Sequence, residues 1–254
     1  MTKIDNHKGL LLCAKYSVAP NFFGYCGPDK NTNLVDHLTS DIGDREVKEI
    51  LSEFESLHLN LNLIANQNKI KDPFDYRVVE AYWIGNRLLS NIKNKDYVGL
   101  LGEKFLLHKK IGDEAFGKMK HKFLSFKLLP HHSFHVFNIF KRTGHIVADH
   151  TIETMDNCRV GWGRIIKLSM INNQLSISVK TKQLTISNQH LTMSKEVIKE
   201  LKNDYKGKSF LKNLRVGDWI SFHWGRVCDV LTQQQVKNLD FYTRRAIDFY
   251  NSPV

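Results

Sequence analysis

Long apolar segments are missing from this 254-residue sequence, and an apolar leader is missing from its start. No uninterrupted apolar run approaches the roughly 18 residues that a membrane-spanning helix needs. The opening segment Met1–Asp5 is polar and lacks the charged and apolar regions of a secretory signal. We therefore expect a cytoplasmic protein that has no membrane partner.

Cysteine is also scarce. The four cysteines stand in unrelated contexts and form no C-x-x-C pair; they are Cys13, Cys26, Cys158 and Cys228. This spacing argues against a zinc ribbon and against a disulfide scaffold. Each thiol must therefore be judged from its own surroundings.

A run of charges of one sign is missing as well. The net charge is +11, but residues 1–148 carry 21 basic and 16 acidic groups, and residues 149–254 carry 16 and 10. Nucleic-acid-binding proteins usually gather their basic groups on one face or arm. We take the charge mainly as that of a solvated surface, in preference to a surface for nucleic acid or an acidic partner.

Hydrophobic periodicity divides the chain in two. Up to residue 148, apolar residues recur at three- and four-residue steps, and from residue 149 onward a period of two dominates. The predicted fold class is α+β: an all-helical N-terminal domain over residues 1–148, then a small antiparallel, OB-like β-barrel with a C-terminal helix over residues 149–254. Helices are expected over residues 9–19, 44–68, 72–92, 96–109, 113–128 and 232–250, with a helical insertion in the barrel over 194–204.

The loop over residues 21–29, with the sequence NFFGYCGPD, is the most unusual one. Gly24, Gly27 and Pro28 predict a tight turn around Cys26, where backbone amides are free to approach a ligand. We predict an accessible and catalytic thiol at Cys26, with Tyr25 and Gly27 in contact with a ligand or partner. The alternative is a cysteine wedged under the turn.

Three histidines follow Pro130 within five residues. On a helix, His131 and His135 would share one face, and on a strand they would share one side. This spacing suits a metal ion or a phosphate-like anion, and we predict His131 and His135 as metal ligands. Their neighbour His132 is expected to point elsewhere. The alternative is a set of buried histidines with satisfied hydrogen bonds.

Two motifs in the second half carry a resemblance to a known family. The first is the nine-residue segment CRVGWGRII, which begins at Cys158, and the second is GDWISFH, which ends at His223. They resemble the opening cysteine segment and the histidine strand of the HypC/HupF hydrogenase maturation chaperones. Here some 155 residues precede the cysteine, and Trp162 replaces the family's proline. The whole chain also resembles an uncharacterised bacterial family that joins a helical domain to such a barrel.

The resemblance implies a HypC-like barrel whose cysteine helps to carry an iron centre with cyanide and carbon monoxide ligands to the large subunit of a hydrogenase. By this resemblance, Cys158 is a metal-ligating or partner-bonding thiolate and His223 is its neighbour. Arg159, Trp162 and Trp224 are the predicted ligand- or partner-binding residues beside them. From the residues alone, Arg159 would lower the pKa of the Cys158 thiol and Asp156 would raise it. The alternative to a functional thiol is that Cys158 packs as a small buried apolar residue.

Three functions follow from these features. The first is an accessory or maturation protein of a nickel–iron hydrogenase that handles iron, or docks hydrogenase maturation proteins or the large subunit, through Cys158 and His223. The second is a metal- or thiol-dependent enzyme with an interdomain site, in which Cys158 is catalytic beside three further residues, Cys26, His131 and His135. The third is a nucleic-acid-binding barrel whose tryptophans stack bases.

Overall fold

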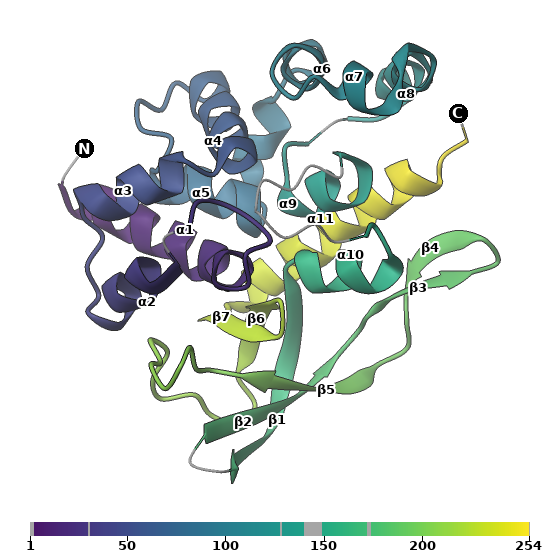
Figure 1. The fold of residues 1–254 in the computed structure, drawn as a ribbon. Helices are drawn as coiled ribbons and strands as arrows, with labels where there is room; N and C mark the ends of the chain where they lie inside the picture. Colours follow the sequence, from purple (N-terminus) through teal and green to yellow (C-terminus); the bar gives the residue numbers. More distant parts are fainter. Residues whose placement is uncertain (1–2, 30, 128, 140–148, 172–173, 254) are drawn as a thin grey trace.

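The computed structural model describes residues 3–29, 31–127, 129–139, 149–171 and 174–253. Helices make up the described chain up to residue 139, here called the helical half, and strands dominate from residue 149 onward, here called the barrel half (Figure 1). The α+β class is therefore confirmed. The expected boundary at residue 148 lies in 140–148, outside the described residues.

The helical half surrounds one long central helix, α1 (Lys3–Phe22), which packs against α2, α3, α5 and strands of the barrel. Its residues from Leu10 to Ala14 are all buried, as expected of a helix with neighbours on several sides. The other elements of this half are α2 (Asn31–Thr39), α3 (Arg45–Ser52), α4 (Glu55–Gln67), α5 (Tyr76–Trp83), the 3-10 turn η1 (Arg87–Asn91), α6 (Asn94–Glu103), α7 (Leu107–Ile111), α8 (Asp113–Ser125), α9 (His132–Phe134) and the π-helical turn η2 (His135–Ile139).

Several expected helices have different ends. The helix predicted over residues 44–68 is two helices, α3 and α4, because the chain bends at Glu53 and Phe54. The helix predicted to start at Asp72 starts later, because Asp75 is the residue whose carboxylate accepts the backbone N–H of Arg77. Helix α1 does not stop before Pro20 but continues through it to Phe22.

The barrel half begins with the short helix α10 (Ile152–Cys158), which the sequence did not predict. The strands are β1 (Gly161–Ile171), β2 (Gln174–Thr181), β3 (Leu184–Ser187), β4 (His190–Met193), β5 (Val197–Lys202), β6 (Trp219–His223) and β7 (Arg226–Val230). Five of them close a barrel in the order β1-β2-β5-β7-β6, and β3 and β4 form a separate hairpin. The barrel is mixed rather than antiparallel, because β5 and β7 run parallel at Lys202 and Arg226.

The expected helical insertion over residues 194–204 is wrong. Strand β5 occupies most of it and pairs with β2 from Val197 to Lys202. Lysine and glutamate give this segment helical propensity, but Leu201 is buried in the barrel and fixes a period of two. Pairing with neighbouring strands therefore overrides the local preference.

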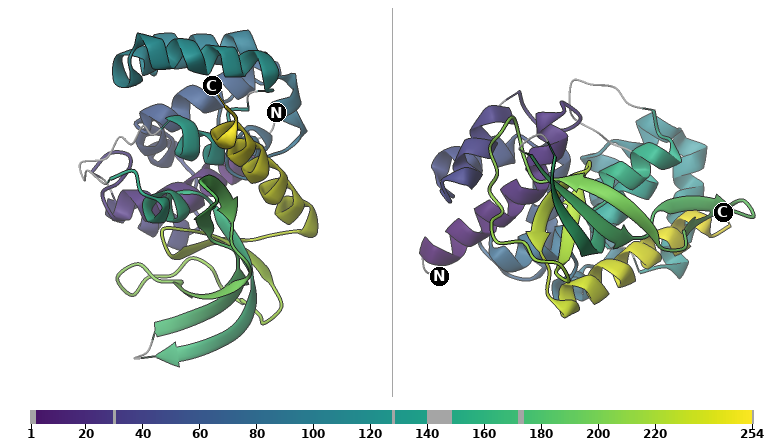
Figure 2. Two further views of the ribbon diagram at one scale, coloured as in Figure 1. Left: turned by 90° about the vertical axis from the view of Figure 1, so that its right-hand side faces the viewer. Right: turned by 90° about the horizontal axis from the view of Figure 1, so that it is seen from below.

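The C-terminal helix α11 (Gln233–Asn251) is confirmed. Thr232 forms a capping box with Gln235, in which each side chain bonds the backbone N–H of the other. From the barrel, α11 runs back along α9 and η2 of the helical half (Figures 1 and 2). It therefore ties the two halves together.

Two hydrophobic clusters hold this arrangement. One fills the barrel and contains Ile165, Ile177, Val179, Leu201, Ile220, Phe222 and Val227. The other extends from α1 through the helical half to Val160, Cys228 and Leu239 of the barrel half. The described residues contain no helix that is both long and apolar enough to cross a membrane.

Candidate metal centre

Three side chains that can bind a metal meet where the two halves contact each other. They are His132 at the start of α9, Cys158 at the end of α10 and His223 at the end of β6. One potential ligand atom of each lies within 4.8 Å of the others. Two imidazoles and a thiol suit zinc and the other borderline divalent metals of the first transition row.

His223 is oriented by the backbone of α1. Its Nδ1 lies 2.8 Å from the carbonyl oxygen of Tyr16. That oxygen can only accept, so Nδ1 carries the proton and Nε2 of the neutral ring keeps its lone pair. Nε2 forms no hydrogen bond of good geometry to a described residue, although the side chain is almost fully buried and the Cys158 carbonyl lies near the ring. This orphaned nitrogen beside a thiol fits a metal ligand, and a backbone carbonyl is a common outer partner of ligating histidines.

The carbonyl that holds His223 is available because of a proline. In an α-helix, the N–H of residue 20 would donate to the carbonyl of residue 16. Pro20 has no N–H and lies inside the last turn of α1. The Tyr16 carbonyl therefore lacks that helical donor, and the imidazole of His223 bonds to it instead.

His132 is held between the two halves. Its Nε2 lies 2.8 Å from the carbonyl oxygen of Cys158, and its Nδ1 lies 3.2 Å from the hydroxyl of Tyr82. Since the carbonyl accepts, Nε2 donates and Nδ1 accepts from Tyr82. The ring also packs on Trp83, with 4.4 Å between centroids.

Both imidazoles are neutral near neutral pH. Burial lowers the pKa of His223 to about 4, although the carbonyls of Tyr16 and Cys158 oppose this. Burial also lowers the pKa of His132 well below its usual value, and the proximity of His223 adds to the effect. Neutral imidazole is the form that binds metals. Neither ring therefore has to be deprotonated from its cationic form before a metal binds.

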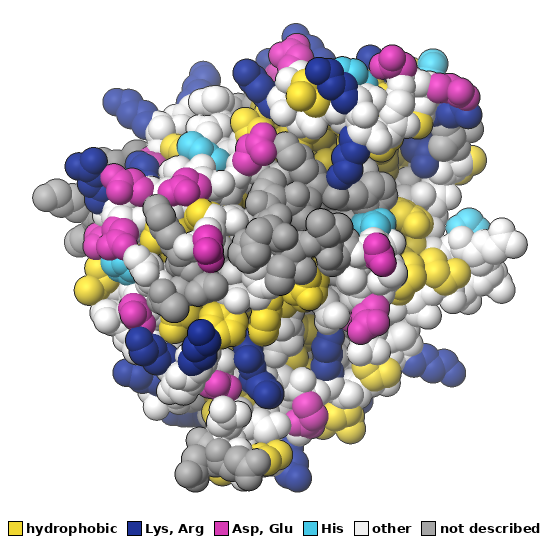
Figure 3. All heavy atoms as spheres, in the orientation of Figure 1, with side chains coloured by type: hydrophobic (Ala, Val, Ile, Leu, Met, Phe, Trp, Pro, Cys, Tyr) yellow, Lys and Arg dark blue, Asp and Glu magenta, His cyan; other side chains and the backbone are white. Residues whose placement is uncertain are grey.

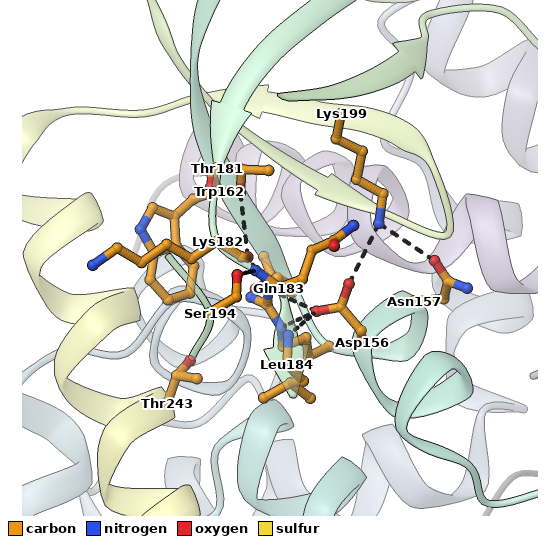
Figure 4. A network of polar contacts seen from close by, with 12 residues as sticks. Asp156, Asn157, Trp162, Thr181, Lys182, Gln183, Leu184, Ser194, Lys199 and Thr243 are labelled. Carbon is orange, nitrogen blue, oxygen red and sulfur yellow. Dashed lines mark hydrogen bonds and ion pairs between the residues drawn. The ribbon is translucent and has the colours of Figure 1, made fainter. Parts of the chain in front are cut away.

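The residues on either side of Cys158 belong to a network of largely buried charges, and Figure 4 shows its contacts around Asp156. The carboxylate of Asp156 accepts from Arg159 at 2.8–2.9 Å and from the backbone N–H of Leu184 at 2.9 Å. It also lies 3.5 Å from Lys199 Nζ. The network connects the end of α10 to the start of β3 and to β5, and Cys158 between these anchors is a partly buried residue.

Arg159 and Trp162, which the sequence predicts to bind a ligand or partner, lie beside this buried network. The guanidinium of Arg159 is 1% exposed, pairs with Asp156, donates to the carbonyl of Lys182 and lies 5.4 Å from the Trp162 ring. The two charges expected to act in opposite directions on the thiol bind each other. Neither Arg159 nor Trp162 lines the cavity described next.

The three donors line an apolar cavity between the halves. Its volume is about 40 Å³, which is room for about three water-sized molecules. Aromatic rings of Tyr25, Tyr82, Trp83 and Trp224 make up much of its wall. Six residues with a nitrogen or sulfur donor line it: Cys26, His132, His135, His150, Cys158 and His223.

The loop around Cys26 forms one wall of this cavity. Tyr25 stacks on Trp224 with 4.0 Å between ring centroids. Gly27 has φ +82°, and a Cβ there would lie 2.3 Å from the ring of Phe54, which also lines the cavity. Asn21 fixes the turn by donating to the carbonyls of Cys26 and Pro28. The loop thus brings Cys26 and Tyr25 to the cavity.

The predicted pair His131 and His135 is separated by the structure. His131 caps the short α9 in an extended conformation, so helical spacing does not apply to it; its ring stacks on Tyr242, and burial lowers its pKa to about 3. His135 lines the cavity, in the π-helical turn η2. His132, expected to point elsewhere, is the member of this segment that joins Cys158 and His223. The sequence alone does not tell which of the adjacent histidines faces the site, because that depends on where α9 begins.

On the face drawn in Figure 3, lysine and arginine side chains are interspersed with aspartate and glutamate. This agrees with the even distribution of charge along the sequence.

The chain was compared with protein families, curated proteins and solved structures. The profile of DUF6390, a family of unknown function, matches residues 5–254. No curated protein and no solved structure matches the chain.

Proposed function

The chain belongs to the DUF6390 family, and we propose that it is a HypC-like accessory protein of nickel–iron hydrogenase maturation. In this role it handles iron as cargo through Cys158 and His223, and it passes the iron to hydrogenase maturation proteins or to the large subunit. The observation that carries the proposal is the group of His132, Cys158 and His223, within 4.8 Å of one another in an apolar cavity.

The resemblance and the geometry support the same two residues independently. The motifs that resemble HypC pick out Cys158 and His223, which lie 65 positions apart in the sequence. The Tyr16 carbonyl keeps the lone pair of His223 Nε2 available for a metal. Cys158 is the partly exposed member of the group, as a carrier that hands over its cargo requires.

The barrel topology adds support at the level of the fold. The closed strand order β1-β2-β5-β7-β6, with the β3-β4 hairpin set aside, is consistent with an OB-like five-stranded barrel. We include the OB-like and HypC-like assignments in the proposal. On this basis the helical half is an addition to the HypC-like barrel. It places His132 near Cys158 and His223.

The test is metal analysis and infrared absorption of protein purified without oxygen from a host that makes a nickel–iron hydrogenase. We expect iron with cyanide and carbonyl bands in the wild type, and loss of both in Cys158→Ser and His223→Gln. Cys228→Ser is the matched control, because Cys228 is fully buried outside the group. Iron and bands retained in Cys158→Ser would overturn the proposal.

One observation favours a second candidate, a thiol-dependent enzyme with an interdomain site at Cys158. A neutral imidazole whose Nε2 lone pair has no partner among the described residues lies beside a thiol, which is the arrangement of a general base and a nucleophile. Of the other residues predicted for such a site, Cys26 and His135 line the cavity and His131 does not. The same experiment separates the candidates, because an enzyme of this kind would hold no iron in either wild type or Cys158→Ser.

A further inference from the structure

We propose that His132 of the helical half is the third protein ligand of the metal, and that the Tyr82 hydroxyl holds its ring in place by bonding Nδ1 both before and after the metal binds. The inference rests on the proposed metal-handling function and specifies its site. A His₂Cys set made in this way joins the two halves of the chain around one ion. It leaves a coordination position open towards the cavity.

The first step of the argument concerns where the His132 ring lies. Nε2 is on the side of Cys158, since it bonds the carbonyl oxygen of that residue at 2.8 Å. Nδ1 is on the opposite side, at 3.2 Å from the Tyr82 hydroxyl. The nitrogen that can reach an ion shared with Cys158 is therefore Nε2.

The second step concerns the proton. With no metal bound, Nε2–H donates to the Cys158 carbonyl and Nδ1 accepts from Tyr82. To bind a metal, Nε2 must lose this proton and Nδ1 must gain one, so the ring stays neutral. The Tyr82 hydroxyl then turns from donor to acceptor for Nδ1–H, which a hydroxyl can do without moving its oxygen. The thiol of Cys158 releases its proton to solvent, so each divalent ion displaces about one proton overall.

The third step concerns the ion. One thiolate and two imidazoles select borderline metals such as Fe²⁺, Co²⁺ and Zn²⁺ over Mg²⁺ and Ca²⁺, which prefer oxygen. The cavity wall beside the donors is largely aromatic, and its remaining nitrogen and sulfur donors come from Cys26, His135 and His150. A small molecule from solution, or a donor of a partner protein, can take the open position.

The experiment uses Co²⁺ as the probe in the full chain without oxygen. Its visible bands report the coordination number, and its charge-transfer band reports the bond to thiolate. We expect one thiolate-bound Co²⁺ in the wild type. His132→Gln should weaken binding by about 100-fold, and Tyr82→Phe by about 10-fold, as for the loss of a ligand's outer partner. Tyr82→Phe should keep the wild-type visible spectrum when it is saturated, because it leaves the three ligands in place.

The matched control is His131→Asn. His131 is equally buried and adjacent to His132, but its ring faces Tyr242, and asparagine retains an oxygen to cap α9. We expect its affinity to stay within about threefold of wild type. Thiolate-bound Co²⁺ with unchanged affinity in His132→Gln would overturn this inference and leave the proposed function standing. No binding by the wild type would overturn both, and binding that depends on His132 in a protein without iron bands would overturn only the hydrogenase role.

Discussion

At the scale of single residues, the buried pair of Asp156 and Arg159 fixes the position of Cys158. Both side chains are largely buried, and the carboxylate also holds the backbone N–H of Leu184. A pair of this kind contributes little compared with well-packed apolar residues, but removing one member leaves an uncompensated buried charge. Its main effect is therefore to hold the end of α10 in one place.

We expect Asp156→Ala to lower the free energy of unfolding by about 3–5 kcal/mol, because Arg159 loses its partner inside the protein. Urea denaturation measures this. Asp240→Ala is the control, since Asp240 pairs with Arg244 on the exposed face of α11 and should cost at most about 1 kcal/mol. Equal losses in the two variants would show that the buried network does not anchor α10.

The residue scale is also where the sequence predicted the site least completely. Cys158 and His223 were found through motifs and Cys26 through its glycine turn, and all three line the cavity. His131 and His132 are adjacent and identical in type, so only the start of the helix decides which ring faces the site. His131 is extended, and its ring packs on Tyr242, which lies more than a hundred residues later in the sequence. Local spacing carries no information about such a contact.

At the scale of elements, the last turn of α1 lacks one helical hydrogen bond, and this leaves a backbone carbonyl available to the site. Pro20 deprives the Tyr16 carbonyl of its helical donor, and His223 takes the vacant position. An alanine at position 20 would restore an N–H that competes for this carbonyl. Pro20 thus removes one hydrogen bond from α1 and allows His223 of β6 to bond the Tyr16 carbonyl.

We expect Pro20→Ala to change the free energy of unfolding by no more than about 1 kcal/mol. It should weaken Co²⁺ binding by about 10-fold, because His223 loses part of the bond that sets its proton position. Titration with Co²⁺ and urea denaturation of the same samples measure the two effects. Pro73→Ala, in a turn away from the cavity, should change neither property. Unaltered Co²⁺ affinity in Pro20→Ala would show that the Tyr16 carbonyl does not control the ring.

The sequence predicted helices and strands well where the hydrophobic periodicity is strong. It predicted them poorly where pairing with neighbouring strands determines the structure. The capped helix α11 and the strands carrying the two motifs were expected and are present. The sequence predicts a helix at strand β5 because lysine and glutamate favour one, whereas pairing with β2 in the barrel makes the segment a strand. Helix α10 is only seven residues long, and isolated helices of that length are not stable by propensity alone. It forms because a capping box closes its N-terminal end and the contacts of Asp156 with Arg159 and Leu184 hold its C-terminal end.

At the scale of the whole molecule, the larger hydrophobic cluster passes from the helical half into the barrel half without interruption. The halves also share α11, which starts beside the barrel and packs on α9 and η2. Residues from both halves form the walls of the cavity. We therefore expect the two halves to be coupled in stability, and both contribute to the cavity.

We expect the chain to unfold in a single transition, because neither half can lose its structure without exposing the shared cluster. Thermal denaturation followed by far-ultraviolet circular dichroism and by tryptophan fluorescence should give coincident curves. Co²⁺ at about 100 times its dissociation constant should add about 2.7 kcal/mol to the free energy of unfolding. Two separate transitions, with only one shifted by the metal, would contradict the coupling.

The split origin of the donors also bears on how such a protein can be inherited. Cys158 and His223 belong to the barrel, but the groups that orient or complete the set, at Tyr16, Tyr82 and His132, all come from the preceding half. A gene fragment encoding the barrel alone would transmit the two motifs and lose the residues that complete the proposed metal site. Recombination at the junction would therefore be selected against, and the two halves would descend as one unit.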